Sequence, residues 1–312
     1  MAIHKLDIRA LGRALGRKAT NAAAYRAGER IRDERSGKVF DHTKRTDVLH
    51  AEIVLPSALA GREIAWARDR ATLWNAAELA EKQKNSRVAR EFMVALPHEL
   101  GSSQRLELTR NFSRQIADRY NVAVDTTIHA PREAGDKRNF HAHLLATTRE
   151  ATESGLGRKA PLELSETNRF LRGMPKSSHE FTAVRKLWAD LTNEALLQAG
   201  IEARVDHRSL RAQGIDREPY PRIPIYAIHA ERRGEFSEIA HRIRERHRER
   251  VQERTAVSQI GRDPVDIARE SAQAWLKYRA RQKAGLELGL ERSKEKSMDG
   301  PARKVHDYDF SL

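Results

Sequence analysis

Two stretches of the chain, NVAVDTTIHAP at 121–131 and RNFHAHLLATTRE at 138–150, alternate in hydropathy and are separated by the polar segment REAGDK. Period-two alternation is typical of strands whose two faces differ, and a short polar break between two such runs indicates a hairpin. With residues 132–138 as the loop, Pro131 faces Asn139 and His129 lies opposite His141. His143 then lies diagonally across from His129, two residues further along its strand. The sequence therefore predicts an antiparallel hairpin in this register.

This register divides the hairpin into two unlike faces. One face carries the three imidazoles together with Thr127 and Asp125. The opposite face is that of an ordinary core and carries Val122, Val124, Ile128, Ala142, Leu144 and Ala146. A slip of one residue would exchange the faces, so the prediction depends on the register.

Three neutral imidazoles on one face are an adequate ligand set for a divalent first-row metal, with coordination positions left for substrate oxygens. The alternative is that each histidine is a partly buried, hydrogen-bonded side chain, which is the usual role of a single histidine. The combination of His-x-His with a third histidine in hairpin register favours the metal. The sequence contains no HExxH, P-loop, GxGxxG or GxSxG motif, so it gives no support to a zinc protease, a nucleotide-binding loop or a serine hydrolase.

The charge balance points to a polyanionic partner. Lysine and arginine number 58 against 44 acidic residues, a formal net charge of +14, and nucleic acid is the commonest partner of so basic a chain. An anionic membrane surface is the competing interpretation, but no basic amphipathic helix with an aromatic face is evident. No apolar run is long enough to span a bilayer. The absence of cysteine excludes disulfides and thiolate metal sites and fits a reducing cytoplasm.

The remaining pattern predicts an α+β fold, because strands and helices alternate without the regularity of a parallel doubly wound sheet. Further strands are expected at 2–10, 48–56 and 88–97. Helices are expected from a cap at Thr20 or Asn21 through residue 34, and at 62–85, 102–120 and 178–199, the last closed by Gly200.

A proline-rich stretch, EPYPRIPIY, marks the expected domain boundary. The predicted organisation is a domain at 1–220, a linker at 221–231, a charged helical extension at 232–290 and a polar tail at 291–312. The arginines of HRIRERHRER are scattered among glutamates around the expected helix, which is typical of a solvated helix.

Tyr25 lies in an alanine-rich helical segment flanked by Arg17, Lys18 and Arg26. A tyrosine in a helix is most often a core aromatic. The small neighbours of this one would leave room beside the ring for a strand of DNA.

Six segments resemble, in order, motifs of the MobA/MobL family: AAAYR, DERSGKVFDHT, VLHAEIVLP, ALPHEL, IHAP with NFHAHLL, and DHRSLRAQGIDREP. These proteins are plasmid mobilisation relaxases of the MobQ class, within the HUH endonucleases. The resemblance covers about residues 1–220. It implies a circularly permuted HUH fold, with a central antiparallel sheet that carries the metal histidines and helices packed around it.

The resemblance also implies an enzyme. Tyr25 would attack one phosphodiester of single-stranded DNA at an origin of transfer, which leaves a 5′-phosphotyrosine and a free 3′-OH, and the reverse reaction would reseal the strand. His129, His141 and His143 would hold a divalent metal, Mg²⁺ or Mn²⁺. The sibling alternative is an HUH replication initiator or single-strand transposase. A non-catalytic origin-binding protein is the alternative from a different functional class. The presence of Tyr25 and all three histidines speaks against it.

Three acidic residues are candidates for supporting roles. Asp125 lies on the histidine face and could orient an imidazole as a carboxylate behind the metal ligands. Glu81 and Glu91 are candidates for proton transfer, against the ordinary role of solvated charges at the ends of elements.

Arg17, Lys18, Arg26 and Arg208 are candidates for contact with DNA phosphates, and Arg208 belongs to one of the family motifs. The expected partners are single-stranded DNA, the origin-of-transfer hairpin, accessory mobilisation proteins and a type IV secretion coupling protein. The expected location is the bacterial cytoplasm, with translocation into recipient cells alongside the DNA.

Overall fold

The computed structural model describes residues 2–133, 136–259, 269 and 271–281 of the chain. The chain divides into two compact units, Met1–Arg208 and Ser209–Leu312. The first unit contains every element predicted upstream of residue 200, and the second contains helices and irregular segments.

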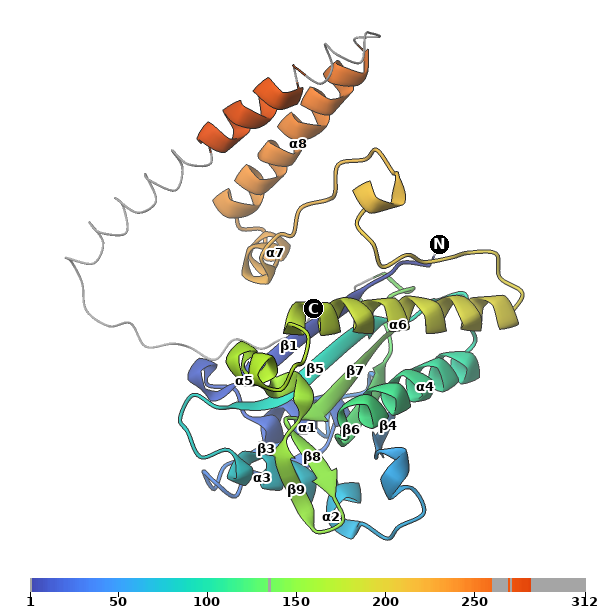
Figure 1. Ribbon diagram of the computed structural model, residues 1–312, viewed down its shortest axis with the longest axis vertical. Helices are drawn as coiled ribbons and strands as arrows, with labels where there is room; N and C mark the ends of the chain where they lie inside the picture. The colour runs from blue at the N-terminus through green and yellow to red at the C-terminus, as the bar shows by residue number, and fades with distance from the viewer. Residues whose placement is uncertain (1, 134–135, 260–268, 270, 282–312) are drawn as a thin grey trace, which may run out of the picture. The chain divides into compact units, whose positions relative to one another are not determined.

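A five-stranded antiparallel sheet forms the centre of the first unit, in the order β1-β5-β7-β6-β4 (Figure 1). Its strands are β1 (Leu6–Gly12), β4 (Val48–Val54), β5 (Arg87–Ala95), β6 (Val124–His129) and β7 (His141–Thr147). The predicted α+β class and the five predicted strand regions are thereby confirmed. The central β5-β7-β6 strands are almost wholly buried because helices cover both faces of the sheet.

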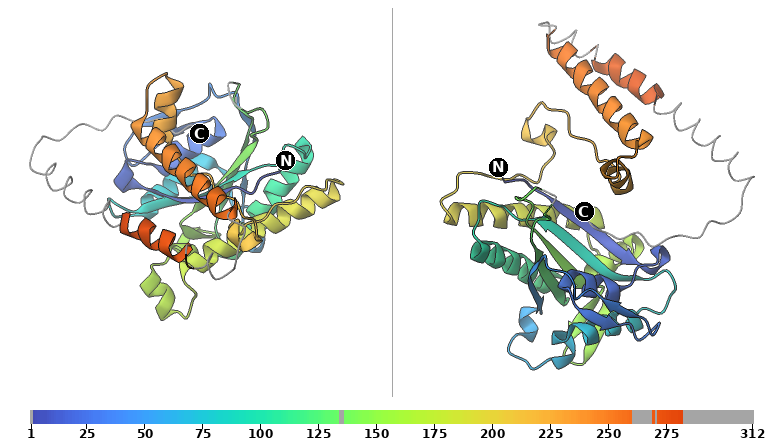
Figure 2. Two further views of the ribbon diagram at one scale, coloured as in Figure 1. Left: turned by 90° about the horizontal axis from the view of Figure 1, so that it is seen from above. Right: turned by 180° about the vertical axis from the view of Figure 1, so that it is seen from behind.

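Each face of the sheet packs against its own helices (Figures 1 and 2). On one face lie α4 (Ser102–Tyr120) and α6 (Ser177–Gln198), whose Phe112 and Trp188 rings are 5.0 Å apart between centroids and fully buried. On the other face lie α1 (Ala19–Ala27) and α3 (Arg70–Ala80), beside the small hairpin of β2 (Arg30–Arg32) and β3 (Val39–Asp41). The sheet therefore separates two hydrophobic cores.

The β6–β7 hairpin has the predicted register, with His129 opposite His141 and Thr127 opposite His143. The predicted apolar face is confirmed, because all six of its residues belong to the core beneath α4 and α6. The histidine face is directed to the side of α1 and α3, where Ala123 and Leu145 from the same two strands join the second core.

Helix α1 is shorter than predicted. It begins at Ala19 and ends at Ala27, where Gly28 adopts a left-handed conformation (φ 68°) and its N–H bonds to the carbonyl of Ala24. The prediction of a helix through residue 34 is therefore wrong, since Gly28 ends it and the following residues form β2. The predicted cap at Thr20 or Asn21 is also wrong, because both residues lie inside the helix and Lys18 is the N-cap residue.

The predicted helix at 62–85 is two helices, α2 (Ala65–Arg68) and α3. They are separated at Asp69, which has extended backbone angles and whose side chain accepts a hydrogen bond from the Thr72 N–H. An aspartate that caps the following turn offers the backbone an alternative to continuous helix. Ile64 and Ala67 before the break and Trp74 and Ala77 after it are nonetheless all buried.

The rest of the first unit consists of short elements and α6. The helix α6 ends as predicted, with Gly200 in the left-handed region (φ 71°) just beyond it. The short elements are the hairpin of β8 (Arg149–Thr152) and β9 (Gly155–Lys159), the helix α5 (Glu166–Leu171), and the 3-10 turns Arg13–Leu15, Ser57–Leu59 and Pro161–Glu163.

The second unit contains the 3-10 turn Arg211–Gln213, α7 (Ile225–Arg232), α8 (Glu238–Gln259) and a helical segment at 271–281. The compact units divide after Arg208, before the boundary predicted at residue 220, and α7 occupies most of the predicted linker. The charged extension is helical at 238–259 and 271–281 but not at 233–237, and the polar tail at 291–312 lies outside the described residues.

Arginines of α8 bond to acidic partners within the second unit. Arg250 Nε donates to Glu218 at 2.6 Å, and Arg244 donates to both carboxylate oxygens of Glu231. Most of the described α8 residues are exposed, as expected of a solvated helix. Among the residues that the structure describes, every helix is too short or too polar to traverse a lipid bilayer.

Candidate active site

Three histidines converge where β6 ends and β7 begins. His129 is the last residue of β6, and His141 and His143 stand at the first and third positions of β7. Their ring centroids are separated by 4.9–5.3 Å, and one ring nitrogen of each lies within 4.8 Å of the others. The alternation of the two strands places all three on one face, so the cluster follows directly from the register.

Backbone carbonyls fix the tautomers of two of these rings. His129 Nε2 lies 2.7 Å from the carbonyl oxygen of Arg26, and His141 Nδ1 lies 3.1 Å from that of Asn139. A carbonyl oxygen can only accept, so each of these nitrogens carries the proton and donates. The other nitrogen of each neutral ring therefore carries a lone pair, as a metal ligand must.

The third ring is oriented by a carboxylate. His143 Nδ1 donates to Glu91 Oε1 at 2.7 Å, and the same oxygen accepts from Arg26 Nε and Nη2 at 2.8 and 2.7 Å. Burial would raise the pKa of Glu91, but the charge of Arg26 and the hydrogen bond from His143 outweigh it and hold that pKa far below its usual range. Glu91 is therefore a permanent anion and a poor base, better suited to orienting His143 than to proton transfer.

All three imidazoles are neutral near pH 7. Burial is the first cause of the lowered pKa of each ring, which falls to about 3 for His129 and about 4 for His141, and which is also lowered for His143. The donor set is thus three uncharged rings, each with one nitrogen bonded to an oxygen acceptor, which is the arrangement found behind histidines that bind metal. These residues fit a divalent first-row cation.

Tyr25 lies on the last turn of α1, three residues before Gly28. Its ring contacts His42 edge-on, with centroids 5.2 Å apart, and the guanidinium carbon of Arg45 lies 3.9 Å from its centroid. The carbonyl of the next residue, Arg26, is the acceptor for His129. The helix that carries Tyr25 therefore ends directly on the histidine cluster.

Asp125 lies on the histidine face, as predicted, but its partners come from α3. Its carboxylate accepts from Arg70 Nε and Nη2 at 2.8 and 3.0 Å and from Trp74 Nε1 at 2.9 Å. The hypothesis that Asp125 orients an imidazole is not supported, because these donors engage both of its oxygens. Its contacts instead join the sheet to α3.

Removal of the Asp125 carboxylate is expected to destabilise the fold. In Asp125→Ala the guanidinium of Arg70, whose side chain is 9% exposed, keeps only its contact with the half-exposed Glu29. Loss of one partner from a buried ion pair costs about 3 kcal/mol in the free energy of unfolding. Urea denaturation measures this. Asp190→Ala, which removes the exposed helical pair with Lys186, is the control and should cost less than about 0.5 kcal/mol. Equal losses in the two variants would contradict the expectation.

Glu81 is not brought to the histidines. Its Oε1 accepts from Arg149 at 2.9 Å and from Lys159 at 2.7 Å, so it joins the end of α3 to the β8–β9 hairpin. The structure gives no support to Glu81 in proton transfer, because both cations are engaged with its carboxylate and its described partners include no ligand histidine.

The four candidate phosphate-binding residues have different surroundings. Arg26 is committed to Glu91, and Lys18 Nζ donates to Asp33 at 2.8 Å. Arg208 is bonded to Asp206 and has an exposed side chain. Burial lowers the pKa of the half-buried Arg17. Contact of these residues with DNA stays a prediction.

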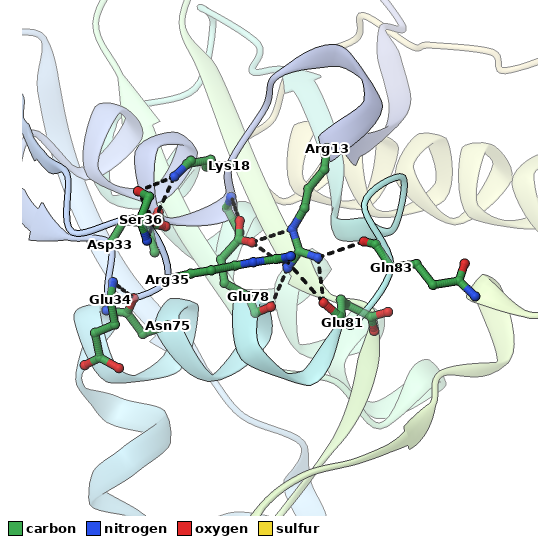
Figure 3. Close-up of polar contacts among 12 residues, drawn as sticks. Arg13, Lys18, Asp33, Glu34, Arg35, Ser36, Asn75, Glu78, Glu81 and Gln83 are labelled. Carbon is green, nitrogen blue, oxygen red and sulfur yellow. Dashed lines mark hydrogen bonds and ion pairs between the residues drawn. The ribbon is translucent and has the colours of Figure 1, made fainter.

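A second network anchors the start of α1 (Figure 3). Glu78 on α3 accepts from the Ala19 N–H at 2.6 Å and, through its other oxygen, from Arg13 at 2.7 Å. Asp33, beyond β2, accepts from the Thr20 hydroxyl at 2.7 Å. Both acids are fully buried, with at most 1% exposure. Glu78 takes the place of an N-cap side chain, and Asp33 holds the first turn of α1 through the Thr20 hydroxyl. The two acids together fix the direction in which α1 approaches the histidines.

The Asp33 contacts should give a measurable dependence of stability on acid. Burial raises the pKa of Asp33, but hydrogen bonds from Lys18, Ser36 and Thr20 outweigh it and lower the pKa from 3.8 to about 2. The stabilisation is therefore complete above pH 3.8 and is lost as the pH falls toward 2. Urea titrations should show a stability difference between wild type and Asp33→Asn that is constant above about pH 5 and shrinks between pH 4 and 2. A difference independent of pH would contradict this assignment.

Sequence reasoning did not identify His42, Arg45 or Asp47. All three lie in the loop HTKRTD that joins β3 to β4. The signals in the sequence were the charge of this loop, its place before a predicted strand, and the family motif DERSGKVFDHT, which includes His42.

Comparison with known proteins identifies related chains. A sequence model of the MobA/MobL family matches residues 17–233. Mobilization protein MobL of Acidithiobacillus ferridurans is 35% identical over 292 residues, which covers 86% of this chain and 74% of that protein. Conjugal transfer protein TraA of Agrobacterium fabrum is 30% identical over 236 residues, or 70% of this chain but only 21% of TraA. The chain thus spans about three quarters of the first relative and about a fifth of the second.

A solved structure titled "Molecular Basis of Vancomycin Resistance Transfer in Staphylococcus aureus" has a similar fold. It is 28% identical, with a TM-score of 0.55 over 67% of this chain and 100% of that chain.

Proposed function

Because the chain belongs to the MobA/MobL family of plasmid mobilisation relaxases, we propose that it nicks one DNA strand at a plasmid origin of transfer and becomes covalently joined to it through Tyr25. Its first unit has the α+β fold of the HUH relaxases, with the five-stranded antiparallel sheet between layers of helices. The observation that supports the proposal most is the hydrogen bond between His129 and the carbonyl of Arg26. It brings the residue after Tyr25 into contact with the histidine cluster.

The proposed reaction is a transesterification. The Tyr25 oxygen attacks the scissile phosphorus, a tyrosyl O–P bond forms and the P–O3′ bond breaks. The phenolic proton is lost and the departing O3′ gains one, so the step needs no other reactant. The products are a 5′-phosphotyrosine and a 3′-OH. Because one phosphodiester replaces another, the reverse reaction can reseal the strand without ATP.

A free phenol has a pKa of about 10 and is a weak nucleophile near neutral pH. His129, His141 and His143 would hold a divalent cation, which when bound neutralises and orients the phosphate oxygens. Mg²⁺ is the proposed ion in cells, with Mn²⁺ as a substitute that imidazoles favour.

Residues of the chain hold this arrangement in place before DNA arrives. The carbonyls of Arg26 and Asn139 and the carboxylate of Glu91 each accept a hydrogen bond from one imidazole. The side chain of Arg26 neutralises Glu91. Such preorganisation lowers the cost of reaching the reactive geometry.

The proposed partners follow from the same function. The net charge of +14 supports binding of single-stranded DNA and of the origin hairpin through phosphates, so affinity should fall steeply with salt. Accessory mobilisation proteins and a type IV secretion coupling protein are proposed partners, with action in the bacterial cytoplasm and transfer alongside the DNA.

The proposal is tested by incubating the full chain with single-stranded oligonucleotides from the origin of transfer of its plasmid and Mn²⁺. One strand should be cut at one position, with an SDS-resistant protein–DNA adduct that EDTA prevents. Oligonucleotides of the complementary strand and of the plasmid's replication origin are the controls. Cleavage at the replication origin alone would favour an initiator. Tight binding without an adduct would favour a non-catalytic origin-binding protein.

A further inference from the structure

The loop between β3 and β4 encloses the Tyr25 ring on two sides. His42 meets the ring edge-on at 5.2 Å between centroids, and its Nε2 is 2.9 Å from Asn21 Oδ1, one turn earlier on α1. Arg45 covers a face of the same ring, with its guanidinium carbon 3.9 Å from the centroid. Since Arg45 N donates to the carbonyl of His42 at 3.1 Å, a tight turn holds both contacts together.

Arg45 is itself fixed by Asp47. The guanidinium donates through Nε to Oδ1 at 3.0 Å and through Nη2 to Oδ2, and the arginine side chain is only 16% exposed. A two-point contact of this kind sets the plane of the guanidinium as well as its position. The ring of Tyr25 therefore lies against a cation that cannot rotate freely.

The same loop is joined to the strand that carries His129. The backbone carbonyl of Asp47 accepts from the Ala130 N–H at 2.8 Å, and Val48 pairs with His129 in the sheet. Arg45 and Asp47 thus form a continuous connection between the tyrosine ring and one of the three histidines.

Gly28 allows this loop to approach α1 closely. Its φ of 68° is unfavourable for other residues, and a Cβ there would lie 3.3 Å from Val48 Cγ2 and 3.7 Å from Arg45 Cβ. The glycine that ends α1 therefore also leaves room for the loop that covers Tyr25.

We propose that Arg45 is a positioning residue for the nucleophile, because it fixes the orientation of the Tyr25 ring relative to the histidine cluster. This inference rests on the proposed function. A tyrosine in the last turn of a helix has rotamer freedom, and a displacement of about 1 Å in a reacting atom can cost about 100-fold in rate. Arg45 removes that freedom through its contact with the ring. Its role is distinct from binding DNA, since its guanidinium is already paired with Asp47.

The test separates positioning from binding. In Arg45→Ala the single-turnover rate of adduct formation at saturating oligonucleotide should fall about 100-fold, while the dissociation constant for DNA changes less than about threefold. Arg45→Lys keeps the charge but lacks a planar two-point contact with Asp47, so it should recover less than about a tenth of the lost rate. The matched control is Arg119→Ala on the opposite face of the sheet. Arg119 lies over the Tyr120 ring at 5.8 Å and pairs with Glu180, and its loss should leave the rate unchanged.

A second readout does not depend on catalysis. Tetranitromethane should nitrate Tyr25 faster in Arg45→Ala than in wild type, because one ring face is uncovered, whereas the exposed Tyr226 should react equally in both. Thermal melting of each variant establishes that it is folded at the assay temperature. If Arg45→Ala fails to fold, the single-turnover rate and the nitration of Tyr25 are both measured on Arg45→Lys.

The outcomes distinguish the two proposals. A normal adduct in wild type with an unchanged rate in Arg45→Ala would overturn the Arg45 proposal alone. A fall in rate explained wholly by weaker DNA binding would overturn it as well. An absence of adduct in wild type would overturn the proposed function, and the role of Arg45 would fall with it.

Discussion

Tyr25→Phe is expected to abolish formation of the covalent protein–DNA adduct while leaving affinity for origin DNA within about threefold of wild type. The substitution removes only the phenolic oxygen. The phenyl ring retains its contacts with Arg45 and His42, so α1 and the loop beyond β3 should keep their positions. The reaction then lacks a nucleophile, because no other group on α1 occupies the position of the phenolic oxygen.

The adduct is measured on denaturing gels with a labelled oligonucleotide, beside fluorescence anisotropy for binding. Tyr226→Phe, at an exposed position in the second unit, is the matched control and should form the adduct normally. Tyr120 is a poor substitute nucleophile, because it is buried and its hydroxyl donates to Glu180 at 3.0 Å. An adduct that persists in Tyr25→Phe would show that another tyrosine reacts.

The second large effect is expected from loss of a metal ligand. His141→Ala removes one of three imidazoles whose nitrogens lie within 4.8 Å of one another. Affinity for Mn²⁺ should fall by more than about 100-fold, because changes to residues that merely orient such ligands already cost about 10–100-fold. The adduct should fall below detection at micromolar Mn²⁺.

Isothermal titration with Mn²⁺ measures the affinity without reference to DNA. His179→Ala, at an exposed position of α6, should bind the ion as wild type does. Wild-type affinity in His141→Ala would mean that the three histidines form a hydrogen-bonded cluster and not a metal centre.

The β6–β7 hairpin could be predicted from sequence because its evidence is local. Alternation assigns every side chain to a face, and a short polar break fixes which residues face one another. His129, His141 and His143 therefore cluster as expected. The same reasoning placed Asp125 on the correct face but could not give its partners, since Arg70 and Trp74 come from α3. Alternation gives the face of the sheet on which a residue lies, but it does not give the helix that covers it.

Errors at helix ends have a similar origin. The alanine-rich start of α1 predicts helix, but Gly28 ends it because the loop at 42–48 packs against that turn. The helix predicted at 62–85 is interrupted at Asp69, whose capping bond competes with continuation. Hydrophobic periodicity predicts which residues face the core, but it does not show where a helix is interrupted.

The supporting charges were the least predictable part of the site. Glu91 was a candidate for proton transfer, with a solvated charge at the end of a strand as the alternative. Its pairing with His143 and Arg26 depends on three segments meeting. Arg45 lies 20 positions from Tyr25 with no periodic relation to it. Its contact exists because β3 and β4 return the chain to the end of α1, which only the tertiary fold determines.

The central claim, that Tyr25 carries the DNA, is tested most directly by mass spectrometry of the adduct. After nuclease and trypsin digestion, the deoxynucleotide should be found on ATNAAAYR, residues 19–26, between the cleavage sites at Lys18 and Arg26. A 5′-phosphate ester is expected on the tyrosine of this peptide. A nucleotide on any other peptide, or the unmodified 19–26 peptide from a quantitative adduct, would contradict it.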